Sequence, residues 1–136
     1  MSLRKKKLAA ATIIPVAKAL TLCDGHIGFA SQKTDLVGIF NSIRPKRYPH
    51  AHKHFVIFAQ LISGLGIVPF YFDLRFAPTG NLIHTTNTQN LNFPHRDKLV
   101  QLAFTMRHCL FPQPGIYLIE LFCNGQWVAD TTLELL

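Results

Sequence analysis

Hydrophobic and polar positions alternate with a period of two over much of this chain. Between Val100 and Met106, for example, the larger apolar side chains stand at every second position. That period is typical of a half-buried β-strand, whereas an amphipathic helix repeats every 3.6 residues. Dipeptides such as Asp24-Gly25, Ser63-Gly64 and Asn124-Gly125 mark turns between the β-prone runs. We expect strands near residues 17–23, 34–43, 54–62, 67–77, 80–86, 98–107, 115–123 and 126–135.

Short β-prone runs separated by turns at this spacing predict an all-β protein. The expected fold is an antiparallel β-sandwich of about eight strands, immunoglobulin-like or C2-like in general form. Its core is expected to be formed by apolar residues at alternate strand positions, namely Leu22, Val37, Ile39, Val56, Phe58, Phe70, Phe72, Leu74, Leu102, Phe104, Tyr117, Ile119, Leu121, Trp127 and Leu133.

The last two runs flank Asn124-Gly125, which is a strong hairpin signal. A two-residue turn at this dipeptide would pair Glu120 with Ala129 and mix charge into both faces of the hairpin. A three-residue loop over residues 124–126 collects the apolar side chains on one face, although it places Glu120 opposite Asp130. The pattern therefore favours the longer loop.

Length and composition indicate one domain that can bury its own core. The chain has 136 residues, of which 49% are hydrophobic and only 15% are charged. No apolar run reaches the ~20 residues of a membrane-spanning helix, so we expect no transmembrane segment. Residues 20–136 are assigned to a single β-sandwich domain, and residues 1–19 to a basic N-terminal segment.

The N-terminal segment joins a basic cluster, Arg4 to Lys7, to a short apolar run that ends near Ala17-Lys18-Ala19. This order is typical of a secretory signal peptide. However, Lys18 lies inside the expected cleavage motif, and Pro15 interrupts the apolar run. We therefore predict a cytoplasmic protein with a basic tail, and secretion is the alternative.

Positive charge exceeds negative charge, with 14 Lys and Arg against 7 Asp and Glu. Such an excess favours anionic partners, such as nucleic acid or an anionic membrane surface. Besides Arg4–Lys7, one loop is dense in cations. Its candidate binding residues are Arg44, Lys46, Arg47, Tyr48 and His50. The cations could hold phosphates and the tyrosine ring could stack on a base, although the loop could equally be a solvated connection between strands.

Three histidines, His50, His52 and His54, stand at alternate positions and would share one face of a regular strand. A cupin-type metal site would place H-x-H on a strand with a glutamate a few residues on and another histidine later, and the two glutamates, Glu120 and Glu134, lie far along the sequence. The seven carboxylates are scattered along the sequence, and the chain lacks a serine elbow and a phosphate-binding loop. We therefore predict no metal, no cofactor, no catalytic residue and no enzymatic activity. A metal-dependent enzyme at the three histidines is the alternative.

The three cysteines, Cys23, Cys109 and Cys123, have no CxxC spacing, which argues against a zinc or redox motif. Cys109 and Cys123 could form a disulfide if they faced each other across neighbouring strands. Buried free thiols are the favoured interpretation.

Several motifs follow one another along the chain, namely Cys23-Asp24, Val37-Gly38-Ile39-Phe40-Asn41-Ser42-Ile43, Pro45 and Pro114-Gly115-Ile116-Tyr117. Their order resembles a family of small uncharacterised bacterial β-sandwich proteins. In that family the first motifs open a compact β-sandwich, and P-G-x-Y begins the last hairpin. The resemblance covers roughly residues 20–136, and Asn41 stands where the family usually has Asp. It implies the sandwich fold and implies no activity, since the family has none established.

These observations together predict a non-enzymatic protein-binding or scaffold module that uses loops or a sheet edge against a protein partner. The alternative is an anion-binding module for nucleic acid or an anionic membrane surface, with Arg4–Lys7 and Arg44–Arg47 as its contacts. A homodimer through a sheet edge is also compatible with a sandwich.

Overall fold

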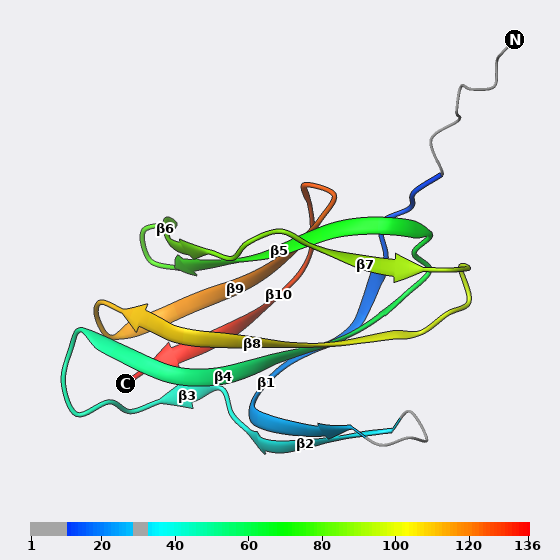
Figure 1. The fold of residues 1–136 in the computed structure, drawn as a ribbon. Coiled ribbons are helices and arrows are strands. Elements are labelled where there is room, and N and C mark those ends of the chain that lie inside the picture. Colours follow the sequence, from blue (N-terminus) through cyan, green and yellow to red (C-terminus); the bar gives the residue numbers. More distant parts are fainter. Residues whose placement is uncertain (1–10, 29–32) are drawn as a thin grey trace, which may run out of the picture.

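The computed structural model describes residues 11–28 and 33–136, whose strands form two sheets packed face to face (Figure 1). The strands are β1 (Val16–Gly28), β2 (Thr34–Ile39), β3 (Ser42–Ile43), β4 (His50–Ile62), β5 (Gly66–Phe76), β6 (Asn81–Thr85), β7 (Gln89–Phe93), β8 (Val100–Phe111), β9 (Gly115–Cys123) and β10 (Gln126–Leu135). The predicted all-β sandwich is confirmed, with more strands than the eight expected.

One sheet has four strands in the order β2-β1-β4-β8, and the other has six, in the order β3-β10-β9-β5-β6 with β7 also paired to β5. Neighbouring strands are antiparallel, except that the short β3 runs parallel to β10. β8 ends the four-stranded sheet on one side. No helix among the described residues is long and apolar enough to cross a membrane.

The core lies between the sheets and is rich in aromatic side chains, among them the fully buried Phe55, Phe72 and Tyr117. Alternate residues of β5 and β9 point inward from one sheet, and alternate residues of β4 point inward from the other. Eight predicted core residues are buried in this cluster: Leu22, Phe70, Phe72, Leu74, Tyr117, Ile119, Leu121 and Leu133. Leu102 and Phe104 are half-buried and pack against it from the edge.

Three predicted core residues are exposed instead, because Val37, Ile39 and Trp127 have exposed fractions of 49%, 65% and 54%. Val37 and Ile39 lie in β2, an edge strand. Trp127 lies beside the last turn, where a bulge changes the alternation. The prediction was wrong there because period two marks an apolar strand face but does not say whether a second sheet covers it.

Two strand predictions were also wrong. The expected strand 34–43 is divided because β2 pairs with β1 in one sheet, whereas β3 pairs with β10 in the other. The chain therefore passes between the layers at Phe40-Asn41. β7 was missed because its sequence, Gln-Asn-Leu-Asn-Phe, contains residues that are rare in strands, and it forms only by pairing with β5.

The β9–β10 hairpin combines the two turn alternatives. Cys123 pairs with Gln126, and Asn124 and Gly125 have φ angles of 53° and 76°, so the turn has two residues. The predicted three-residue loop was wrong. A bulge between Trp127 and Ala129 nevertheless shifts the register, which places Glu120 opposite Asp130 as expected for the longer loop.

The first described residues already belong to the fold. Ile13 forms an isolated bridge with Leu65, and β1 begins at Val16, inside the range 1–19 that was assigned to the basic segment. The cluster Arg4–Lys7 lies outside the described residues.

Candidate functional site

β8 is a long edge strand with one free side. Its residues from Val100 to Phe111 pair with β4, and no other described strand pairs with β8. In an antiparallel ladder, half of the backbone N–H and C=O groups of an edge strand point away from its neighbour. β8 therefore has a row of backbone donors and acceptors that no described strand pairs with.

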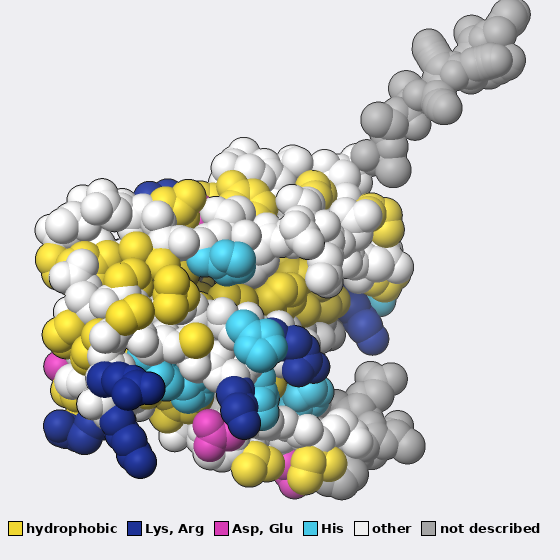
Figure 2. Space-filling view, turned by 60° about the vertical axis from the view of Figure 1, so that its left-hand side comes forward, with side chains coloured by type: hydrophobic (Ala, Val, Ile, Leu, Met, Phe, Trp, Pro, Cys, Tyr) yellow, Lys and Arg dark blue, Asp and Glu magenta, His cyan; other side chains and the backbone are white. Residues whose placement is uncertain are grey.

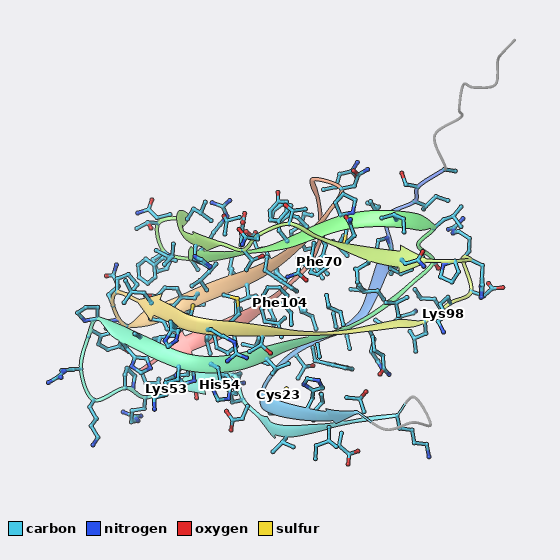
Figure 3. The ribbon with its side chains drawn as sticks, in the orientation of Figure 1. Cys23, Lys53, His54, Phe70, Lys98 and Phe104 are labelled. Atoms are coloured by element: carbon cyan, nitrogen blue, oxygen red, sulfur yellow. The ribbon has the colours of Figure 1, made fainter. Side chains whose placement is uncertain are left out.

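A partly covered apolar seam runs beside this edge. Phe104 points from β8 toward β5, and its ring centroid lies 6.2 Å from that of Phe70 and 5.3 Å from that of Phe72 (Figure 3). Phe104 and Leu102 are only half-buried because no strand lies beyond β8. A gap of about 220 Å³ separates β8 from residues 84–89 of the other sheet. Hydrophobic side chains are visible in the hollow between the two layers (Figure 2).

A paired irregularity in β4 and β8 places polar side chains on the outer face of the four-stranded sheet. In β8, Arg107 and His108 are both exposed between the buried Met106 and Cys109, and His108 has a φ of 51°. In β4, two consecutive residues, Lys53 and His54, are likewise exposed before the buried Phe55. We call Lys53, His54, Arg107 and His108, together with the loop cations Arg44, Lys46 and Arg47, the basic face.

The same irregularity separates the three histidines. The His50 ring stacks on Phe111, and the His52 ring lies against Phe55, so both point toward the core side. His50 Nε2 and His52 Nδ1 lie 3.1 Å apart. His54 is exposed on the other side of the shift in alternation. No group of three His, Cys, Asp or Glu side chains is placed to hold a metal ion in the described part of the chain.

Burial and then the neighbouring His50 lower the pKa of His52 below its ordinary value of 6.5, and His54 lowers it slightly further. Asp24 acts in the opposite direction. His52 therefore favours its neutral form in the folded protein.

The predicted basic loop keeps three free cations. Arg44, Lys46 and Arg47 are exposed, and no ion pair within residues 11–28 and 33–136 involves them. Tyr48 is half-buried against the core, and its hydroxyl donates a 2.9 Å hydrogen bond to the Leu136 carbonyl. The structure thus places the loop cations on the surface and holds Tyr48 and His50 within the fold, where their rings pack on protein neighbours.

A groove on the outer face was missed by sequence reasoning. After Cys23, β1 leaves β4 and pairs with β2, and this hairpin lies over the outer side of β4 and β8 (Figure 1). A groove of about 760 Å³ separates the hairpin from the start of β8. Its lining includes Phe58, Lys33 and Lys98. No local motif signals it, because its walls come from segments far apart in the sequence.

The Cys-Asp and Gly-Ile-Phe motifs shape this hairpin. Gly38 has a φ of 68°, and a Cβ built on it would overlap the Asp24 carboxylate. Cys23 is fully buried, and the Phe40 amide donates to the Leu22 carbonyl at 3.0 Å. These motif residues are explained by the packing of the hairpin.

The three cysteines are free and buried, as predicted. Cys109 lies in β8 and Cys123 in β9, so they belong to different sheets and do not face each other across neighbouring strands. Burial raises the pKa of Cys109 to about 12 and that of Cys123 to about 11.

The chain is similar to known proteins at the level of a family and of solved structures. A protein-family model described as a family of unknown function, DUF6941, matches residues 18–136, which confirms the resemblance seen in the motifs. No match was found among curated proteins. An immunoglobulin-like protein from Pseudomonas aeruginosa is similar at 11% identity and a TM-score of 0.36, with 93% of this chain and 98% of that chain covered.

Proposed function

The chain belongs to this family of unknown function, and from that premise we propose that it is a non-enzymatic module that binds an extended, acidic segment of a partner protein along β8. The observation that carries the proposal is the free side of β8, which is 12 residues long. Strand addition to such an edge uses backbone hydrogen bonds for affinity and side-chain pockets for selectivity.

The other edges are less suitable for a long segment. β6 and β7 have 5 residues each, and β2 has 6. β10 is longer, but β3 pairs with it at Glu134 and Leu135, and β1 lies against it. Natural sandwiches shorten or cover edges because a free edge invites pairing. A long edge that is left open therefore supports a binding role.

The seam supplies apolar selectivity. An added strand would cover the half-buried Leu102 and Phe104, whose exposed parts lie beside the edge. The left-handed backbone of His108 interrupts the regular ladder, because the pairing of β4 with β8 skips Lys53 and His108. The usable edge therefore runs from Val100 to Met106.

The positive charges at the two ends of this edge indicate the charge of the partner segment. Lys98 lies just before β8, and Arg107 is exposed close to its end. Neither takes part in an ion pair among the described residues. Complementary charge fixes register and speeds association, so an acidic segment is the matching partner.

The test is a phage-displayed library of random 12-residue peptides selected on the purified protein. We expect enrichment of peptides with alternating apolar residues and with Asp or Glu. A selected synthetic peptide should slow amide hydrogen exchange in residues 100–106. Arg107→Glu should weaken its binding at least tenfold.

Lys18→Glu is the matched control, because it reverses one exposed positive charge on β1, away from β8. Its peptide affinity should stay within twofold of the parent protein. Selected peptides that protect other segments while leaving 100–106 unchanged would rule out the β8 proposal. So would equal losses in the two variants.

A second candidate is an anion-binding surface for nucleic acid on the basic face. The observation that favours it is the gathering of Lys, Arg and His on one side of the molecule (Figure 2). The exposed cations of this face form no ion pairs in the described ranges. Because Tyr48 is tied into the fold, phosphate contacts rather than base stacking would dominate.

Fluorescence anisotropy of labelled DNA and RNA oligomers at low and physiological salt tests this second candidate. Binding should fall linearly on a log–log salt plot, since each phosphate contact releases counterions. Replacing Arg44, Lys46 and Arg47 by Gln should make the slope of this plot less steep. Lys18→Gln should leave the slope close to that of the parent protein. Absence of binding at low salt would eliminate the candidate.

A further inference from the structure

We propose that the groove between the β1–β2 hairpin and the start of β8 is a binding site for a small organic anion with a planar apolar part. This inference goes beyond strand addition at β8, since it concerns the outer face of the sheet and a small molecule, and Lys98 is the one charged residue that the two proposals share.

The floor of the groove is apolar. Phe58 lies there with only 6% of its surface exposed, and its cross-strand neighbour Ala103 also lines the groove. Phe58 is buried without belonging to the core between the sheets. A large aromatic side chain on the outer face of a sheet is thus held at the bottom of an open cavity. A flat apolar group can pack against such a floor.

The rim is rich in positive charge and in hydrogen-bond donors. Lys33 and His26 line it from the hairpin, and Lys98 and His95 line it from the segment before β8. Asp97 is the one acidic side chain recorded among the lining residues. The lysines form no ion pair elsewhere in the described chain. Two ammonium groups and two imidazoles therefore surround the floor, and Asp97 is the one carboxylate beside them.

The two walls are tied together. Thr34 Oγ1 donates a 2.9 Å hydrogen bond to Gln101 Oε1, which joins the hairpin to β8 beside the groove. Lys98 lies at the start of β8, on the side toward which the hairpin extends (Figure 3). The groove is therefore largely formed before any ligand arrives, which reduces the conformational entropy lost on binding.

Size and chemistry together define the ligand. The volume of about 760 Å³ lies within the range of roughly 300–1,000 Å³ that is usual for small-molecule sites. The lysines match a phosphate, carboxylate or sulfonate, and the floor matches an aromatic ring. Free aromatic acids and nucleoside monophosphates share this chemistry, so competition must distinguish them.

The experiment uses 8-anilinonaphthalene-1-sulfonate as the probe, because it joins a sulfonate to flat rings, and follows its fluorescence with the full chain. We expect saturable binding that adenosine monophosphate or benzoate displaces. Displacement by the nucleotide alone would identify a phosphate ligand, and displacement by benzoate would identify a carboxylate. Failure of both anions to displace the probe would overturn the proposal.

Variants locate the bound probe. Lys33→Gln with Lys98→Gln should weaken binding at least tenfold, whereas Lys53→Gln with Arg107→Gln removes the same charge from the same face outside the groove. The control pair should change affinity less than twofold. Gly28→Trp should also weaken binding without a change of charge, because a Cβ at this lining residue meets no heavy atom within 4 Å.

Each variant is compared with the parent protein by near-ultraviolet circular dichroism, so that loss of binding is not confused with loss of folding. Equal weakening by both lysine pairs would reduce the effect to general electrostatics and refute the site. Undiminished binding in a folded Gly28→Trp protein would do the same.

Discussion

Gly38 connects a sequence motif to the shape of the β1–β2 hairpin. Its φ of 68° lies in the left-handed region, which costs an L-residue about 1–2 kcal/mol. A Cβ at this position would also overlap the Asp24 side chain. We expect Gly38→Ala to lower the free energy of unfolding by about 2–3 kcal/mol, measured by urea denaturation.

Gly25→Ala is the matched control in the paired strand. Gly25 lies opposite Val37, and a Cβ there meets nothing within 4 Å. Because Gly25 is not among the residues with positive φ, alanine should leave stability unchanged or raise it slightly. A similar loss in both variants would show that Gly38 has no special role.

His52 predicts how stability depends on pH. Burial first, and then the charge of His50, lower its pKa in the folded protein below 6.5. The unfolded chain therefore binds a proton more readily than the folded one. Its contribution to stability is complete above pH 6.5 and is lost as pH falls through the lower folded pKa.

Chemical denaturation over a pH series checks this expectation. His52→Gln should reduce the loss of stability on acidification, because the titrating group is gone. His84→Gln replaces an exposed histidine of β6 and should leave the pH dependence as in the parent protein. A parent protein that gains stability on acidification below pH 6.5 would contradict the assignment.

On the scale of elements, β5, β9 and β10 bring three carboxylates into one row. Asp73 lies opposite Glu120, and Glu120 lies opposite Asp130. Arg75 relieves this repulsion, since its Nε donates to Glu120 Oε1 at 2.8 Å and its Nη2 approaches Asp73 Oδ2 at 3.5 Å. Thr85 Oγ1 also donates to Asp73 Oδ1 at 2.7 Å.

We expect Arg75→Met to lower the free energy of unfolding by about 1–2 kcal/mol, because facing carboxylates lose their shared cation. The Arg75 side chain is 33% exposed, so solvent screening keeps the effect below that of a fully buried pair. Thermal and urea denaturation measure it. Adding Glu120→Gln should restore part of the loss, and a double variant no more stable than Arg75→Met would argue against repulsion as the cause.

The alternating pattern predicted the elements well wherever a strand has its own β-prone residues. β9 and β10 have the predicted bounds, because their apolar and β-branched residues specify strands locally. β7 forms because it pairs with β5, and the expected strand 34–43 is divided because its two parts pair with different sheets. Local sequence does not show which strand a segment will pair with. The Trp127 bulge escaped prediction for the same reason.

The candidate site was predictable to a similar degree. A run of cations in a loop stays on the surface in any sandwich, so the exposure of Arg44, Lys46 and Arg47 could be predicted, and their role in binding stays a prediction. His54 does not share a face with His50 because the inward–outward alternation changes at Lys53-His54 in β4 and at Arg107-His108 in β8. Local sequence does not show this change. The groove needs the β1–β2 hairpin to fold over Phe58, which only the tertiary structure shows.

At the scale of the whole molecule, the two outer faces differ in charge. The four-stranded sheet carries the basic face and the groove, whereas the six-stranded sheet carries the carboxylate row centred on Glu120. An excess of positive charge spread evenly would favour only solubility. Its concentration on one face, beside the open edge β8, favours the acidic or anionic partners proposed above.

The three thiols can report how the layers of the molecule open. Cys109 and Cys123 belong to the core between the sheets, whereas Cys23 is buried outside that cluster, where β1 passes from pairing with β4 to pairing with β2. Burial raises the pKa of all three, to about 12 for Cys109 and about 11 for Cys123. Because the thiolate is the reactive form, we expect almost no reaction with a disulfide reagent in the native protein.

Low denaturant should separate the thiols. Cys23 belongs to the β1–β2 hairpin at the end of a sheet, and we expect this hairpin to open at a lower free energy than the sheets separate, so Cys23 should be alkylated first. Cys109 and Cys123 should follow together in the global transition, and mass spectrometry of the labelled peptides identifies each site. Gly38→Ala should speed alkylation of Cys23 and leave the order unchanged, since it weakens the hairpin directly. Simultaneous labelling of all three thiols would mean that the hairpin unfolds only with the sandwich, and that the wall of the groove is as stable as the core.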